Sequence, residues 1–439
     1  MRVLTHALII VLGATMPWMA INAETAGLTL DKAIRIAVTT DPWIMGSRYQ
    51  ETALADEAVA AATLPDPRVS VMAANLPTDG FDLGQEAMTQ LTVGVTQMFP
   101  RGDSRALARR QKQQSSLQQP LLRLDREANV AATVSQLWLE AFKAGESIRL
   151  IEGDRALFEQ LVDAAEASYA TALGRARQQD VIRAQLELTR LDDRLAALNQ
   201  QKESAQQQLS EWVGELADST PAGPLPMLEL PAPALLMDNR PLSQPLSRQD
   251  WYEWLRLHPA VQAEDRRIDS MATGVELARQ KYQPEWGVSA QYGYRAEDPM
   301  GRERANLFSV GVSFDLPLFT SNRQDRDVSA AVARAEAVKT DKLLLVRQLM
   351  AKLETARVQL RRLDQRQTLY QRQLLPQMSE QAEAALGAYN NDDGDFAEAV
   401  RSRIAELNTK IDALAIAVDR QKTIAQIRYL LAQVPTANG

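Results

Sequence analysis

The chain has 439 residues, a net charge of −7, no cysteine and two histidines. The acidic balance gives no reason to expect a nucleic-acid partner, and the missing cysteines exclude a disulfide framework and thiolate metal sites. With so few histidines, most routes to a catalytic triad or a metal centre are also weakened, so we expect no enzyme, no cofactor and no resident metal.

The first 23 residues predict a cleaved export signal. Arg2 supplies the positive start, residues 7–20 are mostly apolar, and Ala23 offers a small residue at the cut. The apolar run is too short to favour the alternative, an uncleaved membrane anchor. Since no cysteine follows the signal, we expect no lipid anchor on the mature chain.

Residues 28–64 predict helix with an interruption at Asp41-Pro42, and Pro65-Asp66-Pro67 ends it. The period then changes from helical to alternating. Apolar residues alternate with small or polar ones over about 67–76 and 88–99, which predicts two strands joined by a loop rich in Gly, Asp and Pro.

A very long helix is predicted from residue 104 to about 172, and a return helix from about 178 to 213. Apolar residues at alternating spacings of four and three form a heptad seam typical of coiled-coil-like packing. The seam consists of Val130, Val134, Leu137, Ala141, Ala144, Ile148 and Ile151.

The second half repeats the first after 217 residues. Pro42 corresponds to Pro259, Pro67 to Pro284, and the segment 92–96 (TVGVT) to 309–313 (SVGVS). We therefore predict a first structural repeat over 24–220 and a second over 246–434. A Pro-rich linker over 221–245 would drape against the outside of the helices, and 435–439 would form a flexible tail.

In the second repeat, strands are predicted at about 285–294 and 306–316, and helices over about 323–388 and 397–433. His258, the one histidine outside the predicted signal, corresponds to Asp41 and precedes Pro259. This position indicates a residue that caps or flanks a helix.

Each predicted strand has about the nine or ten residues that a tilted strand needs to cross a bilayer. No stretch after Ala23 is apolar for about eighteen residues, so no transmembrane helix is predicted. An ordinary sheet packed on a soluble core is the alternative. If the strands do lie in a membrane, four per chain cannot close a barrel, whereas three copies supply twelve strands and four supply sixteen.

The chain resembles the TolC-type outer-membrane efflux proteins over essentially its whole mature length. The opening segment 28–34 (LTLDKAI) followed by Asp41-Pro42 carries the resemblance, together with the helical hairpin turns after Tyr169 and Tyr389. The resemblance implies a mainly α fold with a small β part. Long helical hairpins would form an α-barrel below a trimeric, twelve-stranded transmembrane β-barrel.

The same resemblance implies a passive exit duct of a tripartite efflux system in the outer membrane of a Gram-negative cell, with a large periplasmic portion. Its partners would be two further copies, outer-membrane lipid, a periplasmic adaptor and an inner-membrane RND-type pump. The segments 64–67 (LPDP), 75–77 (NLP) and 97–102 (QMFPRG) are most similar to members that serve heavy-metal cation pumps. Ducts for drugs or for type I protein secretion remain alternatives.

Two hairpin turns are the candidate sites. In the first turn the resemblance implies adaptor docking by Leu173, Gly174 and Arg175, although a glycine here could simply end a helix. The second turn is rich in acids, which predicts a cation-attracting ring at a periplasmic gate, with a solvated turn as the alternative. The ring and its latch consist of Tyr389, Asp392, Asp393, Asp395 and Glu398.

Two other classes of protein compete with the duct. A soluble periplasmic coiled-coil adaptor also has long helical hairpins, but it carries one hairpin flanked by β domains rather than two with paired strands. An exported enzyme would need a convergent polar motif, which the sequence does not offer.

Overall fold

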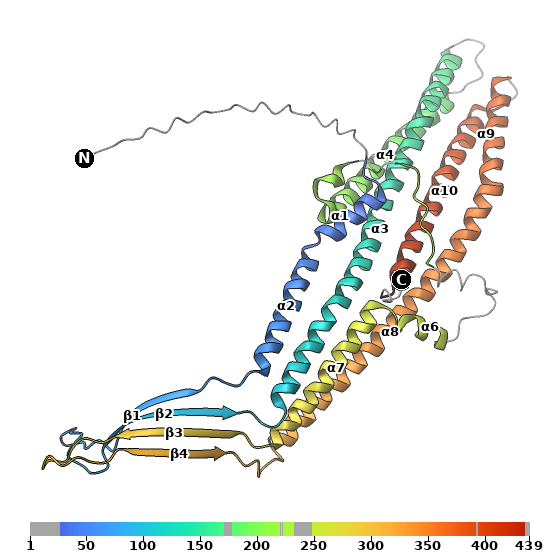
Figure 1. The fold of residues 1–439 in the computed structure, drawn as a ribbon. Coiled ribbons are helices and arrows are strands. Elements are labelled where there is room, and N and C mark those ends of the chain that lie inside the picture. Colours follow the sequence, from blue (N-terminus) through green and yellow to red (C-terminus); the bar gives the residue numbers. More distant parts are fainter. Residues whose placement is uncertain are drawn as a thin grey trace, which may run out of the picture.

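The computed structural model describes residues 27–170, 178–219, 221, 223–231, 248–391 and 394–434. In this part of the chain, long helices dominate, and a small antiparallel sheet extends away from one end of them (Figure 1). The tips of two helical hairpins lie at the opposite end. The predicted class, mainly α with a small β part, is therefore confirmed. The predicted signal peptide and tail lie outside the described residues.

The first half contains two short helices, two strands and a long helical hairpin. These elements are α1 (Leu30–Thr40), α2 (Pro42–Ala62), β1 (Arg68–Ala74), β2 (Gln90–Phe99), α3 (Ser104–Ala170) and α4 (Gln178–Val213), followed by the 3₁₀ helix η1 (Gly214–Asp218). The predicted interruption separates α1 from α2. There Asp41 caps α2 by accepting a hydrogen bond from Trp43 N at 2.9 Å, and Pro42 occupies a position that needs no N–H donor.

The second half has a similar order of elements. These are α6 (Arg248–Leu255), α7 (Pro259–Arg279), η2 (Gln280–Tyr282), β3 (Trp286–Tyr294), β4 (Leu307–Phe314), α8 (Gln324–Leu369), η3 (Tyr370–Leu374), α9 (Leu375–Asn390) and α10 (Phe396–Leu430). Helices α2 and α7 both have 21 residues. His258 caps α7, as its position indicated, because its Nδ1 accepts a hydrogen bond from Ala260 N at 3.2 Å.

One predicted helix is interrupted. The sequence predicts a continuous helix over 323–388, but η3 is a turn of π-helix that separates α8 from α9. Pro376 follows at the start of α9; it has no N–H and its ring crowds the carbonyl four residues earlier. The backbone hydrogen bonds therefore change from the α-helical to the π-helical pattern for one turn. Such a local change often accompanies a proline in a helix. Pro120, in contrast, lies inside the uninterrupted α3.

The apolar seam predicted along α3 lies in the core. Val134 and Ile151 are fully buried, and Leu137, the least buried member of the seam, packs against the same core cluster as Val134. At about 1.5 Å per residue, the 67 residues of α3 extend roughly 100 Å. Within the described residues, no helix has both the length and the apolar content needed to cross a bilayer.

Three apolar clusters hold the helices together. One joins α1, α3, α4 and η1, a second joins α6, α7, α8 and α10, and a third lies toward the hairpin tips. The segment 223–231 crosses the first two, because Leu228 packs against both and its N–H donates to Gln421 Oε1 at 2.8 Å. This part of the predicted linker does lie against the helices.

The four strands are all antiparallel and lie in the order β1-β2-β3-β4. Their register departs from the sequence repeat. Val69 pairs with Val95, but their counterparts 217 residues later, Trp286 and Val312, are not paired; Trp286 pairs with Phe314 instead. The second hairpin is thus shifted by two residues. An even shift keeps every side chain on its original face, so the two-sided pattern survives.

Candidate functional site

One face of the sheet is apolar and exposed. Directly paired residues share a face, so the rows Val69–Val95–Ala290–Val310 and Val71–Val93–Tyr292–Phe308 cross all four strands on the same side. Val69 and Val310 are about two-thirds exposed, at 68% and 67% of the accessible area of the whole residue. A continuous apolar face of this kind, left uncovered by the other described residues, marks contact with lipid or another protein.

Aromatic residues lie at both ends of this face, and valine and alanine lie between them. Phe99, Trp286 and Phe314 form a row at the end near the helices, where the Trp286 and Phe314 rings are 4.8 Å apart. Tyr292, Tyr294 and Phe308 lie toward the far end. Girdles of aromatic side chains on either side of an apolar band are typical of strands that cross an outer membrane.

The opposite face carries small and polar residues. Ser70, Gly94, Gln291 and Ser309 form one row across the sheet. A Cβ atom at Gly94 would lie 2.9 Å from Ser70 Oγ, so the glycine makes room for the neighbouring polar side chain. The sheet is therefore a wall with one apolar side and one polar side.

Both outer strands of the sheet have an open edge. Among the described residues, β1 pairs only with β2, and β4 pairs only with β3. Each outer edge therefore presents backbone N–H and C=O groups without a strand partner in the described chain. Such edges must be paired or covered before they can lie in lipid.

At the far end of the sheet, the two strand-connecting loops are joined. Arg295 donates to the Ala87 carbonyl at 2.7 Å, and Arg304 donates to the Glu86 carbonyl at the same distance. No sequence pattern predicts these contacts, because arginine is common in loops and the acceptors here are backbone atoms. These two hydrogen bonds fix the position of one loop relative to the other at the end of the sheet far from the helices.

The described residues of the second hairpin turn lie at the opposite end of the molecule. Tyr389 packs edge-on against Phe396, with ring centroids 5.4 Å apart. Asp395 caps α10 by accepting from Ala397 N at 3.4 Å, and Glu398 pairs with Arg401 at 2.9 Å. Asp395 and Glu398 therefore each have a partner inside the chain.

The remaining predicted site residues, Leu173, Gly174, Arg175, Asp392 and Asp393, lie outside the described residues. In the second turn, the backbone at Gly394 lies very close to the end of α9. A Cβ atom there would lie 2.7 Å from Tyr389 N, which explains why this position is glycine. The structure thus brings Tyr389 close to Gly394, Asp395 and Phe396 but leaves the acidic ring a prediction.

A groove of about 320 Å³ runs between α4 and α10 near the tips. Its walls contain three arginines, of which Arg190 pairs with Glu187 and Arg401 with Glu398. Arg183 is exposed and forms no salt bridge with the other described residues. The groove therefore offers a basic side chain above an apolar floor that includes Phe396 and Val400.

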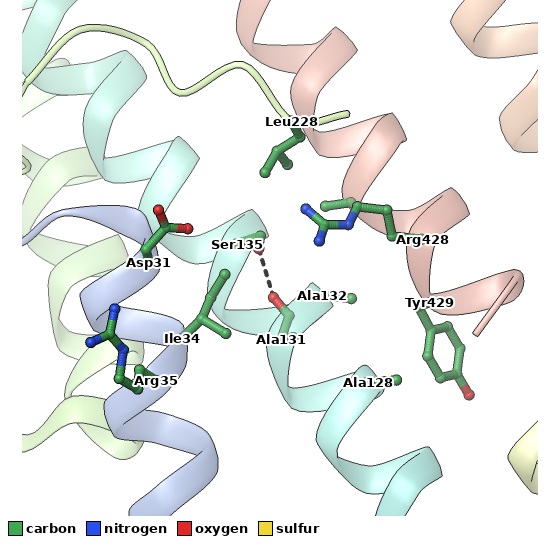
Figure 2. A pocket seen from close by; sticks show the side chains of 11 residues that line it. Asp31, Ile34, Arg35, Ala128, Ala131, Ala132, Ser135, Leu228, Arg428 and Tyr429 are labelled. Carbon is green, nitrogen blue, oxygen red and sulfur yellow. Dashed lines mark hydrogen bonds between the residues drawn. The ribbon is translucent and has the colours of Figure 1, made fainter. Parts of the chain in front are cut away.

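A second cavity, of about 500 Å³, lies between α1, α3 and α10 at the middle of the molecule (Figure 2). Its floor is formed by small residues of α3, among them Ala128, Ala131 and Ala132. Arg35 and Arg428 line it from α1 and α10. The sequence pattern did not single out this cavity, because its lining comes from helices far apart in the chain.

Tyr429, which lines this cavity, also belongs to a small cluster of titratable residues with Asp125 and the buried His258. His258 Nδ1 lies 4.0 Å from Asp125 Oδ1, and its Nε2 lies 3.1 Å from the Tyr429 carbonyl. Burial lowers the pKa of His258 and raises the pKa of Asp125. Burial and the Asp125 carboxylate together raise the pKa of Tyr429 to about 12. Because the backbone N–H of Ala260 can only donate and the carbonyl can only accept, the imidazole is neutral and carries its proton on Nε2.

No family model matches the sequence, and no curated protein matches it. Solved structures do match its fold. The outer membrane protein VceC from Vibrio cholerae has a TM-score of 0.72 at 15% identity, covering 92% of this chain and 96% of that one. The open state of the MtrE outer membrane channel from Neisseria gonorrhoeae has a TM-score of 0.70 at 15% identity, covering 92% and 89%.

CusC, described for its folding and transmembrane channel formation, has a TM-score of 0.71 at 13% identity and covers 92% of each chain. At such identities the likeness establishes the fold. The chain has the fold of outer-membrane channel proteins, and its resemblance to the TolC-type channels is confirmed at that level.

Proposed function

We propose that the protein is the outer-membrane exit duct of a tripartite efflux system, and that it conducts its cargo passively. The two-sided sheet carries this proposal. Its apolar face has the aromatic girdles of a membrane wall, its other face suits water, and its two open edges require further strands.

Three copies would close these edges into a twelve-stranded barrel, with β4 of one copy next to β1 of another. The long helices would continue the same tube into the periplasm. The correspondence between the two halves, seen in the equal lengths of α2 and α7, supports a ring in which six similar units surround one channel.

The hairpin tips would dock a periplasmic adaptor, through which an inner-membrane pump of the RND type delivers cargo. The groove between α4 and α10 supports this assignment, because it lies near the hairpin tips and its Arg183 forms no salt bridge with another described residue. Replacing Arg183 with Glu should weaken crosslinking to the adaptor. Replacing Arg190, which already pairs with Glu187, is the matched control.

The acidic turn would gate the duct and favour cations. Replacing Asp392, Asp393 and Asp395 together with Ala should reduce the cation selectivity of single channels in planar bilayers. Because Asp395 also caps α10, a variant with only Asp392 and Asp393 replaced separates selectivity from the stability of the turn. Unchanged selectivity in both variants would rule out the ring.

For the cargo, we propose heavy-metal cations. The segments 64–67, 75–77 and 97–102 support this narrower assignment, as does an acidic entrance to the tube. Deleting the protein should sensitise cells to metal cations more than to drugs. Sensitivity to drugs alone, or loss of a secreted protein, would favour the other cargo classes.

Membrane fractionation tests the duct itself. We expect the protein in the outer membrane as an oligomer that survives mild detergent and dissociates on heating. A soluble periplasmic monomer would end this proposal and favour the adaptor class.

A further inference from the structure

A polar groove of about 430 Å³ lies where α3, α8 and α10 meet. Helix α10 contacts both of the other helices and lies between them (Figure 1). Charged and amide side chains make up most of the lining, in contrast to the cavity beside α1, whose floor consists of alanines. The charged members come from α8 and α10 and are Arg362, Arg366, Asp419 and Lys422.

The groove opens on the side of α10 that faces away from α1 and the segment 223–231. On the α1 side, Leu228 N donates to Gln421 Oε1 at 2.8 Å, and Arg428 lines the cavity (Figure 2). Asp419 and Thr423 each lie two residues from Gln421, about 200° around the helix, and both line the groove. Helix α1 and the segment 223–231 would obstruct a tube from within. The groove therefore belongs to the inner wall of the proposed duct.

Two arginines one turn apart on α8 give the groove its positive charge. Arg362 and Arg366 are exposed, and neither forms a salt bridge within the described part of the chain. Arg362 Nη1 donates to Gln365 Oε1 at 2.9 Å, and Arg366 Cζ lies 5.9 Å from the centre of the Tyr370 ring. These neutral partners orient the guanidinium groups but leave their charges and most of their N–H groups available.

The other charges in the lining do not cancel the two arginines. Lys422 donates to Glu140, so its charge is already matched within the wall. Asp419 makes no salt bridge to another described residue and opposes the arginines with a single negative charge. The remaining polar lining includes amides, which can donate hydrogen bonds without adding charge; these are Gln136, Gln359 and Gln426.

We propose that this groove binds small multivalent oxyanions of the phosphate type. Each guanidinium can donate two parallel hydrogen bonds to such an anion, and residues one turn apart on a helix are close enough to act on the same ligand. An anion with several negative charges gains more from Arg362 and Arg366 together than it loses to Asp419.

This inference rests on the proposed function, in which three copies close one tube, and it adds a site that the acidic turn does not provide. Three copies would place three such grooves around the inner wall. Exposed arginines there repel cations, and bound oxyanions offset that repulsion. The inner wall therefore makes the conductance of the duct depend on anions.

Channel block by sodium tripolyphosphate tests the site. Full-length protein would be reconstituted in planar bilayers at about 0.1 M salt, where screening is moderate. We expect tripolyphosphate to reduce the current. Arg362→Gln combined with Arg366→Gln should raise the half-blocking concentration about tenfold or more. Asp419→Asn should lower it. Arg361→Gln is the matched control, because this residue follows a different side of α8 and does not line the groove; it should block like the wild type.

Calorimetric titration of the detergent-solubilised oligomer with tripolyphosphate separates binding from block. Binding without block would place the groove outside the tube and overturn the inference. Equal block of the double variant and Arg361→Gln, or neither binding nor block by the wild type, would also show it to be wrong. In each of these cases a conducting channel leaves the duct standing. A protein that forms no channel would contradict the duct and this groove together.

Discussion

Helices α2 and α7 have equal lengths, but they begin in chemically different ways. Asp41 caps α2 and pairs with Arg126 Nε at 2.7 Å, whereas His258 caps α7 and faces Asp125. Asp125 and Arg126 are neighbours on α3, so both capping residues contact the same turn of this helix. The first cap is part of an ion pair, whereas the second is a neutral imidazole.

The two helices also differ in how much of their surface the described chain covers. Helix α7 lies inside one chain, with a helix on each side, and its cap is a buried neutral histidine. Helix α2 has one open face, and the charged pair at its start is partly accessible, with 31% of the Arg126 side chain exposed. The two halves have a similar order of elements, and the starts of α2 and α7 differ in their chemistry.

The largest effect is expected from the core of the first half. Trp138 is buried, stacks on Phe142 and donates through Nε1 to the Leu28 carbonyl at 2.7 Å. Trp138→Ala should cost about 3–5 kcal/mol, and Trp138→Phe, which loses mainly the hydrogen bond, about 1–3 kcal/mol. Hydrogen exchange should show α1 loosened and α6 unaffected.

The matched change in the second half is Leu353→Ala, which removes a buried side chain from the cluster around α6 and α8. It should cost about 2–5 kcal/mol and loosen α6 rather than α1. If Trp138→Ala loosened both helices equally, the two halves would not have separate cores.

A smaller effect is expected at the caps. Asp41→Ala removes a cap and leaves Arg126 without its partner, whereas His258→Ala removes a cap alone, which typically costs about 0.5–2 kcal/mol. The Asp41 variant should therefore unfold at the lower temperature in detergent solution. Asn at either position can still cap and should recover part of the loss. Equal losses from both alanine variants would contradict the distinction between the two caps.

The smallest expected effect is a change in the stability of the folded protein with pH. Burial lowers the pKa of His258, so below about pH 6.5 the unfolded chain takes up a proton more readily than the folded chain. The stability contributed by the neutral histidine is thus present above this pH and is lost as the pH falls toward the lower folded pKa. The unfolding temperature of the wild type should fall between pH 7 and pH 5 more than that of His258→Asn.

Asp125 acts in the opposite direction but at lower pH, since its pKa is raised from an ordinary value near 4. Asp41→Asn is the control, because it changes a helix cap and keeps the buried histidine. A wild-type profile parallel to that of His258→Asn would show that folding does not change the pKa of this histidine.

Much of the fold followed from local sequence signals. Asp41-Pro42 located the break between α1 and α2, the heptad seam located the buried side of α3, and the position of His258 before Pro259 predicted a cap. These features depend on residues close together in the chain. The π-helical turn before Pro376 was missed because the helical pattern continues on both sides of it.

Features that depend on distant residues could not be predicted in the same way. The two-residue shift of the second hairpin is invisible in the sequence, since an even shift leaves the alternation unchanged. The loop contacts of Arg295 and Arg304 use backbone acceptors, which carry no sequence signal. The acidic turn was recognised from its composition, but composition did not reveal that Asp395 caps α10.

The central claim is that the sheet is a membrane wall with lipid on one side and water on the other, and neighbouring residues of β4 test it most directly. Single cysteines at Val310 and Ser309 in this cysteine-free chain would carry the same environment-sensitive fluorophore in reconstituted membranes. We predict that lipid-bound quenchers reach the label at 310 and that iodide in the water-filled channel reaches the label at 309. Quenching of both labels by iodide, with neither reached from the lipid, would contradict the membrane wall.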